Sequence, residues 1–257
     1  MKYVKYVIES LKTGGFKLFF ISMKYFFLKK VPNKNVEINN SEMGHYLCRE
    51  NTQDFIYSFY SYEYKIKNCI KSLIQEYDAF IDIGACIGDY SIWLSKNQLK
   101  CFAFEPNKDN YNCMLNNIRL NNLEKSIETF NYGLGSKSEN VVFQTHPYNK
   151  GYSGKYARFK DSEKCEVEIK VFDDIFETLD LTYDQAIIMK IDAEGMEKEI
   201  IVGAKNFFSN VQKTLLIFES HTRSEETLKE LDKISSFQLI DLDELNIGVL
   251  INNNNTK

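Results

Sequence analysis

Two acidic residues and two glycines form the pattern in this chain that is most informative about chemistry. Asp82 ends a short apolar run, Gly84 and Gly88 follow it, and Glu105 comes directly after a second apolar run. A strand, a glycine turn, a helix and a second strand that leads into an acid form the order of a nucleotide-binding βαβ unit. The alternative interpretation is a tight strand-to-helix turn that binds nothing.

The position of Asp82 indicates which nucleotide the turn would bind. A carboxylate at the mouth of the turn repels the pyrophosphate of a dinucleotide. The expected ligand is a nucleoside that carries positive charge there, and S-adenosylmethionine fits because it has a sulfonium and an α-ammonium group. We therefore expect Asp82, Gly84 and Gly88 to hold the methionine moiety, Glu105 to bind the ribose hydroxyls, and Asn131 with Tyr132 to lie along the adenine.

A second group of charged residues follows a later apolar run. Lys190 and Asp192 alternate along that run, and Glu194 lies just beyond it. A hydroxyl nucleophile must lose a proton, and the candidates for the base are Asp192, Glu194, Glu219 and His221. We expect Asp192, Glu194 and His221 to be catalytic, with Asp192 the most important. Asp192 and Glu194 could instead chelate magnesium, but no third ligand stands at a suitable spacing, so we expect no metal.

The elements that would position these residues alternate regularly after residue 61. Strands are predicted at 79–82, 100–104, 127–131, 186–192, 214–219, 237–241 and 248–251, and helices at 62–75, 89–97, 107–121, 194–208 and 223–234. This order predicts an α/β fold with a Rossmann-like, mostly parallel sheet and helices on both faces. The last two strands have no helix between them, which predicts an antiparallel C-terminal edge.

The alternation lapses over residues 133–183. Short strands are predicted there at 141–145 and 166–171, around a loop at 149–155 that is rich in glycine and serine. Tyr148, Tyr152 and Tyr156 lie in or beside this loop. We expect a substrate loop rather than a solvated connection, because its base follows the third strand and so lies near the ligand-binding edge.

Composition indicates one enzyme domain, residues 61–257, preceded by an N-terminal arm, residues 1–60. The formal net charge of −4 gives no general attraction to nucleic acid. The six cysteines include no Cys-x-x-Cys pair, so we expect reduced thiols and a cytoplasmic protein.

The arm differs in charge from the rest of the chain. Its first 30 residues hold seven lysines and one acid, and two short amphipathic helical pieces are separated at Gly14 and Gly15. The apolar run is too short and too charged to span a bilayer, and no signal-peptide cleavage site is evident. We expect a helical arm that packs on the domain or on a second subunit of a homo-oligomer. The alternative is a peripheral membrane anchor near a lipid-linked substrate.

Several motifs together resemble the FkbM family of S-adenosylmethionine-dependent methyltransferases. The likeness covers roughly residues 60–220. The motifs are Asp-Ile-Gly-Ala-Cys-Ile-Gly at 82–88, Phe-Glu-Pro-Asn at 104–107, the pair Asn117 and Asn121, Lys-Ile-Asp-Ala-Glu-Gly at 190–195, and Ile-Ile-Val-Gly-Ala at 200–204.

This resemblance implies O-methylation of a small-molecule or sugar hydroxyl, commonly in antibiotic, lipopolysaccharide or capsule synthesis. It also implies a cofactor-binding role for Glu63, which falls where the family tends to have an acid followed by proline. Here Tyr64 replaces that proline, and Cys86 stands where the family often has asparagine.

Rival functions lack their own signatures. A short-chain oxidoreductase would need a middle glycine in the turn and a Tyr-x-x-x-Lys pair downstream of it, whereas the pair Tyr25 and Lys29 lies upstream. A methyltransferase acting on nitrogen would typically carry an Asn-Pro-Pro-Tyr element at the fourth strand. A non-catalytic nucleoside-binding scaffold stays an alternative, although both acids and the whole 190–195 element are retained.

Overall fold

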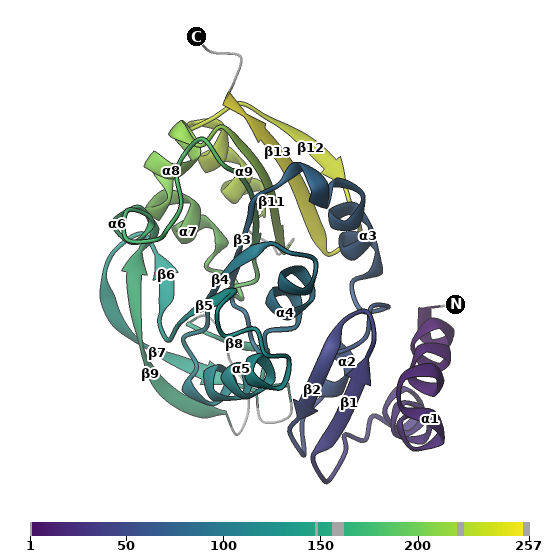
Figure 1. Ribbon diagram of the computed structural model, residues 1–257. Coiled ribbons are helices and arrows are strands. Elements are labelled where there is room, and N and C mark those ends of the chain that lie inside the picture. The colour runs from purple at the N-terminus through teal and green to yellow at the C-terminus, as the bar shows by residue number, and fades with distance from the viewer. Residues whose placement is uncertain (1, 147–148, 156–161, 220–223, 254–257) are drawn as a thin grey trace.

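Seven strands form the central sheet of the computed structural model, in the order β12-β13-β11-β10-β3-β4-β5 (Figure 1). The structure describes residues 2–146, 149–155, 162–219 and 224–253. The strands are β3 (Ala79–Ile83), β4 (Lys100–Phe104), β5 (Ile127–Phe130), β10 (Ala186–Ile191), β11 (Lys213–Glu219), β12 (Phe237–Asp241) and β13 (Asn246–Asn252). Strands β11, β10, β3, β4 and β5 pair in parallel, and β13 pairs antiparallel with both β11 and β12. The predicted antiparallel edge is confirmed.

The strand order reverses between β3 and β10. From β3 the chain continues to β4 and β5 on one side, and it later returns to place β10 and β11 on the other. In open α/β sheets this switch point, at the carboxyl ends of the strands, is where ligands bind. Asp82 lies in β3 and Asp192 directly follows β10, so the fold brings them to the same edge.

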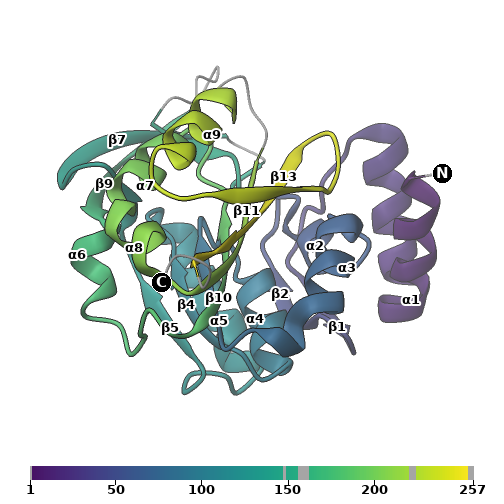
Figure 2. The ribbon, with the colours of Figure 1, turned by 90° about the horizontal axis from the view of Figure 1, so that it is seen from above.

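Helices cover both faces of the sheet, as predicted (Figures 1 and 2). Alternate residues of a strand serve the two faces: Phe80 belongs to one buried cluster, and Ile81 to the other. The first face carries α3 (Tyr64–Leu73), a 3₁₀ turn (Ile74–Glu76), α4 (Asp89–Lys96) and α5 (Lys108–Leu120). The second carries α6 (Phe172–Phe176), α7 (Glu197–Gly203), α8 (Lys205–Asn210) and α9 (Ser224–Asp232).

The single helix predicted at 194–208 is wrong in detail. It begins later, at Glu197, and α7 and α8 are separate helices. Glu194 and Gly195 have φ values of 50° and 96°, so the chain leaves β10 through a left-handed turn rather than a helix. This turn keeps Glu194 beside the end of the strand.

The insertion after β5 forms a second sheet, with strand order β6-β9-β7-β8. Its strands are β6 (Gly133–Gly135), β7 (Glu139–Thr145), β8 (Ser153–Gly154) and β9 (Glu163–Val171). The two strands predicted here correspond to β7 and β9, which pair antiparallel with Val141 opposite Val167. The turn from β7 to β8 carries the predicted substrate loop.

Residues 1–60 are only partly helical. Helix α1 (Lys2–Leu28) consists of two pieces joined by a kink at Gly15, as expected, and α2 (Asp54–Tyr57) is a single turn. Between them lies a hairpin, β1 (Val36–Asn40) and β2 (Gly44–Cys48), which the helical interpretation of this segment missed. The alternation of apolar Val36 and Ile38 with polar neighbours is the strand signal present in the sequence, and the structure buries both side chains.

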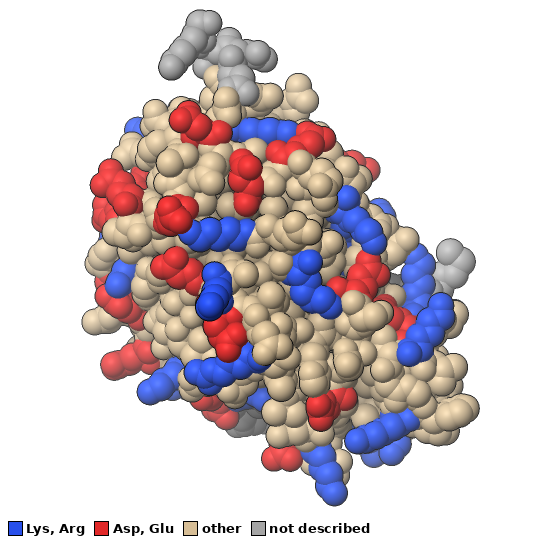
Figure 3. Space-filling model, in the orientation of Figure 1, with Lys and Arg blue, Asp and Glu red and all other residues tan. Residues whose placement is uncertain are grey.

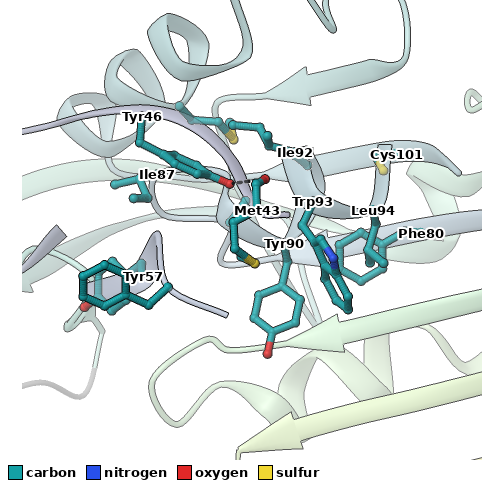
Figure 4. Packing of buried hydrophobic residues seen from close by; sticks show 14 of the residues in the cluster. Met43, Tyr46, Tyr57, Phe80, Ile87, Tyr90, Ile92, Trp93, Leu94 and Cys101 are labelled. Atoms are coloured by element: carbon teal, nitrogen blue, oxygen red, sulfur yellow. Dashed lines mark hydrogen bonds between the residues drawn. The ribbon is translucent and has the colours of Figure 1, made fainter. Parts of the chain in front are cut away.

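The hairpin is part of the main core. Figure 4 shows Met43 and Tyr46 packed with Ile92 and Trp93 of α4, and Tyr46 Oη donates a hydrogen bond of 2.9 Å to the carbonyl oxygen of Met43. Buried aromatic rings of this size supply much of the apolar area that stabilises the fold.

Asn117 on α5 and Asn121, the residue that caps its C-terminus, attach the hairpin to the rest of the domain. Asn121 accepts from His45 N at 2.9 Å and donates to His45 O at 2.7 Å. Asn117 accepts from Leu47 N at 2.9 Å and donates to Ile87 O, in the glycine turn, at 3.1 Å. The two side chains therefore satisfy four backbone groups of the hairpin and the glycine turn.

A half-buried carboxylate holds α1 on the domain. Glu9 accepts hydrogen bonds from Tyr60 N at 2.6 Å, Ser61 N at 2.8 Å and Asn40 Nδ2 at 2.9 Å. Tyr6 and Leu18, from the two pieces of the helix, are buried in the core beside this contact. One face of the arm is thus a structural part of the fold.

Replacing Glu9 tests this attachment. Glu9→Ala leaves two backbone N–H groups without their charged acceptor, so we expect a loss of about 2–3 kcal/mol in the free energy of unfolding. Denaturant unfolding followed by circular dichroism measures it. Glu50→Ala, at an exposed acid in the same segment, should change stability by less than about 0.5 kcal/mol. Equal effects in the two variants would contradict the assigned role of Glu9.

Candidate active site

A cavity of about 310 Å³ opens at the carboxyl ends of β3 and β10. It lies at the switch point, where the sequence analysis placed the cofactor. Its most distinctive property is the number of carboxyl groups in its wall, and these are Glu63, Asp82, Asp89, Asp192, Glu194 and Glu219. Such a wall attracts cations and repels phosphates.

The glycine turn between β3 and α4 forms one side of the cavity. Gly84 has φ of +86°, and a Cβ there would lie 1.9 Å from the carbonyl oxygen of Asp192. Only glycine allows the two strand ends to approach this closely. Cys86 also has positive φ, at 48°, a conformation that asparagine adopts more readily than cysteine.

Glu105 braces the same turn from β4. Its carboxylate accepts a hydrogen bond from Cys86 N at 2.8 Å and another from Asn107 N at 2.8 Å. Burial raises the pKa of Glu105 to about 7, although these two hydrogen bonds act in the opposite direction. Each carboxylate oxygen has a second lone pair, so the group can still accept a hydroxyl proton.

Lys190 carries a positive charge at the floor of the cavity. Its Nζ donates to Asp192 Oδ2 at 2.7 Å, lies 4.0 Å from Glu63 Oε2, and stands over the ring of Tyr90 at 4.9 Å. Burial alone would lower the pKa of Lys190, but Asp192, Glu63 and Asp82 raise it well above its usual value. Tyr90 Oη in turn donates to Glu63 at 2.8 Å, so these groups form one network.

Two buried acids lie on the α4 side of the network. Asp82 accepts from Ser91 Oγ at 2.6 Å, and burial raises its pKa to about 6. Burial also raises the pKa of Asp89 to about 7, against the attraction of Lys67. Lys67 is fully buried and donates to the carbonyl oxygen of Tyr62 at 2.7 Å.

Three carboxyl groups gather on the opposite side. Ligand oxygens of Asp192, Glu194 and Glu219 all lie within 4.8 Å of one another, because β11 pairs in parallel with β10. Burial and the neighbouring acids raise the pKa of Glu194 to about 10 and that of Glu219 to about 8. The group could hold a divalent cation. Glu219 supplies the third ligand that sequence spacing did not reveal.

Other walls of the cavity come from segments far away in sequence. Tyr57 and Tyr62 enter from the stretch around α2 and the start of α3, and Asn149 and Tyr152 come from the predicted substrate loop. Tyr57 Oη donates to Asn149 Oδ1 at 2.8 Å and so ties the two segments together. No sequence signal identified Tyr57 and Tyr62. Tyr148 and Tyr156 lie outside the described residues.

Not every expected residue reaches the cavity. Asn131 is exposed, and its side chain donates to the carbonyl oxygens of Glu105 and Pro106. Tyr132 packs on Phe104 under the ammonium group of Lys170. Neither residue lines the cavity or the small apolar hollow beside Glu105, which includes Pro106, Leu134, Phe143 and Met196. Gly88 is the N-cap residue of α4 and does not line the cavity. His221 lies outside the described residues.

An open sheet with this strand order, a glycine turn after β3 and an acid after β4 defines a Rossmann-like methyltransferase fold. The sequence model described as the methyltransferase FkbM domain matches residues 82–241, well over half of the chain. The protein belongs to this family and is a methyltransferase, as the motifs predicted.

Individual relatives are distant. The chain is 24% identical to methyltransferase sdnD of Sordaria araneosa over 67% of its own length and 77% of the relative's. It is 27% identical to the hexuronic acid methyltransferase AglP of Haloferax volcanii, over 57% of each chain. A crystal structure of methyltransferase FkbM from Methylobacillus flagellatus aligns with a TM-score of 0.48 at 17% identity, over 68% of this chain and 44% of that one.

The raised pKa of Glu194 predicts how stability depends on pH. The folded state keeps this proton up to a pH of about 10, whereas the unfolded chain releases it near 4.5. The contribution to stability is therefore complete below pH 4.5 and is lost as pH rises. Glu194→Gln keeps the shape of the side chain but cannot titrate. The melting temperature of the variant minus that of the wild type should therefore increase from pH 5 to pH 9. A constant difference across this range, measured by thermal unfolding, would contradict the assignment.

Proposed function

We propose that the protein is an S-adenosylmethionine-dependent O-methyltransferase that acts on a hydroxyl of a sugar or related small molecule. The observation that carries this proposal is the acid-lined cavity at the switch point of a methyltransferase sheet. A cavity whose wall holds six carboxyl groups suits a sulfonium nucleoside and disfavours a dinucleotide.

The residues present fit this cofactor. Asp82 and the backbone at Gly84 would hold its methionine end together with Glu63, which lines the same cavity, and Glu105 in the adjoining hollow would accept from the ribose. The apolar hollow beside Glu105 would take the adenine in place of the surface occupied by Asn131 and Tyr132. When bound, the cofactor would supply an electrophilic methyl group.

The chain's own contribution is positioning and proton removal. A hydroxyl must be held about 3 Å from the methyl carbon and in line with the sulfur, which the cavity walls can enforce. Glu194 and Glu219 keep protons near neutral pH, because their pKa values are raised to about 10 and about 8. Asp192 stands beside them with Lys190 as its partner, and we assign it the role of proton acceptor.

The acceptor class rests on the relatives. AglP is named a hexuronic acid methyltransferase, which supports a saccharide hydroxyl as the substrate of this chain. We place the activity in surface polysaccharide or natural-product synthesis. All six cysteines have free thiols, in agreement with a cytoplasmic location.

Cofactor binding provides the first test. Glu105→Ala removes the proposed ribose acceptor, so affinity for S-adenosylmethionine should fall by about 1.5–3 kcal/mol, roughly 10- to 160-fold. Isothermal calorimetry measures the affinity, and circular dichroism checks that the variant is folded. Glu128→Ala, at an exposed acid on the neighbouring strand β5, should bind like the wild type. The proposal fails if the wild type binds NAD and does not bind S-adenosylmethionine.

The role of Asp192 provides the second test. Asp192→Asn keeps the shape and removes the charge, so the single-turnover rate on an identified acceptor should fall by about 10²–10⁴-fold with cofactor affinity nearly unchanged. His221→Asn should cost less. A severe defect in the histidine variant beside a near-normal aspartate variant would transfer the base to His221. Asp192 would then be only the structural partner of Lys190.

A further inference from the structure

The two pieces of α1 repeat one pattern of burial and charge. Residues 4–12 and 16–24 align with a shift of twelve positions, and the shift superimposes both lysines and the serine of each piece. Equivalent positions of the two pieces are buried or exposed alike in the structure. The inward pairs are Tyr6 with Leu18 and Ser10 with Ser22, and the outward pairs are Val4 with Phe16, Lys5 with Lys17, Ile8 with Phe20, and Lys12 with Lys24.

The outward side of α1 exposes large apolar side chains. Phe16 is 73% exposed and Phe27 is 71% exposed, and Val4, Ile8, Leu11, Phe20 and Leu28 are between 42% and 61% exposed. In each piece these side chains recur at helical spacing and form a stripe. Helix α1 lies at the edge of the molecule, beyond the β1–β2 hairpin (Figures 1 and 2). An apolar stripe of this size marks a surface that contacts another apolar phase.

Positive charge flanks the stripe. Residues 1–34 hold eight of the 32 basic residues of the chain but one of its 36 acidic residues. That acid, Glu9, faces inward and binds the backbone of residues 60 and 61, so it does not offset the lysines outside. Figure 3 shows lysine side chains beside uncharged surface at the α1 edge.

A groove of about 600 Å³ combines both properties. It lies between the second piece of α1 and the segment that leads to β1. Lys17, Lys24, Lys30 and Lys34 line it, Phe20 and Val31 contribute apolar walls, and no acid is among its lining residues. Such a groove suits anionic phosphate groups that are attached to apolar chains.

We propose that α1 docks the protein on the surface of a membrane that contains anionic lipids. The lysines would contact lipid phosphates, and the phenylalanines would enter the boundary between headgroups and acyl chains. No helix in the described ranges is long and apolar enough to cross a membrane, so α1 would lie in the plane of the surface. A second copy of the chain is less suited to cover the outward side of α1, because the lysines of the two copies would face and repel one another. This proposal does not rest on methyl transfer.

Vesicle sedimentation of the full chain tests the proposal. We expect the wild type to sediment with vesicles of phosphatidylcholine and phosphatidylglycerol but not with phosphatidylcholine alone, and salt should weaken the binding. Lys17→Gln/Lys24→Gln and Phe16→Ser/Phe20→Ser should each lower the partition coefficient by about tenfold or more. Lys65→Gln/Lys125→Gln removes the same charge from exposed sites elsewhere and should lower it by less than about twofold.

Three results would overturn the proposal. The first is a wild type that does not partition to anionic vesicles at low salt. The second is an equal fall in the partition coefficient of the Lys65→Gln/Lys125→Gln control, which would show that binding depends on net charge and not on α1. The third is a wild-type dimer, seen by sedimentation velocity without lipid, that Phe16→Ser/Phe20→Ser dissociates. Because the substituted side chains are exposed, thermal unfolding should show all variants folded.

Discussion

The ion pair between buried Lys190 and half-buried Asp192 is the interaction on which the rest of the site depends. Lys190 is 5% exposed, and its ammonium group is the positive charge that faces Glu63, Asp82 and Asp192 at the carboxyl edge of the sheet. Without the acids around it, the buried ammonium group of Lys190 would be an uncompensated charge, which is strongly destabilising. The pair therefore allows acidic groups to be concentrated where the proposed cofactor binds.

Residues that line the cavity show signs of an energetic cost. Several of the acids have raised pKa values, and two cavity residues, Glu63 and Glu194, have φ values of 50°. Left-handed backbone at residues other than glycine costs of order 1–3 kcal/mol and persists where the surroundings enforce it. Glu63 follows residues 60 and 61, whose backbone is held by Glu9, and Glu194 follows β10 of the packed sheet.

Strand ends were predictable from the sequence, and contacts between distant segments were not. Asp82, Glu105 and Asp192 follow from the rule that parallel strands present their carboxyl ends at one edge. The cluster with Glu219 depends on the pairing of β10 with β11, and the entry of Tyr57 depends on how the N-terminal segment folds back. Neither leaves a periodic pattern. The hairpin was missed because its strands are five residues each and follow a strongly helical arm.

We infer that the cavity selects a cation through acids that are partly protonated near neutral pH. A sulfonium would favour their ionised forms, so its binding must release protons. Calorimetry at pH 7 in buffers of different ionisation enthalpy counts these protons for S-adenosylmethionine and for S-adenosylhomocysteine, whose sulfur is uncharged. We expect tighter binding and a greater proton release for the sulfonium compound. Equal affinity with equal proton release for the two ligands would contradict it.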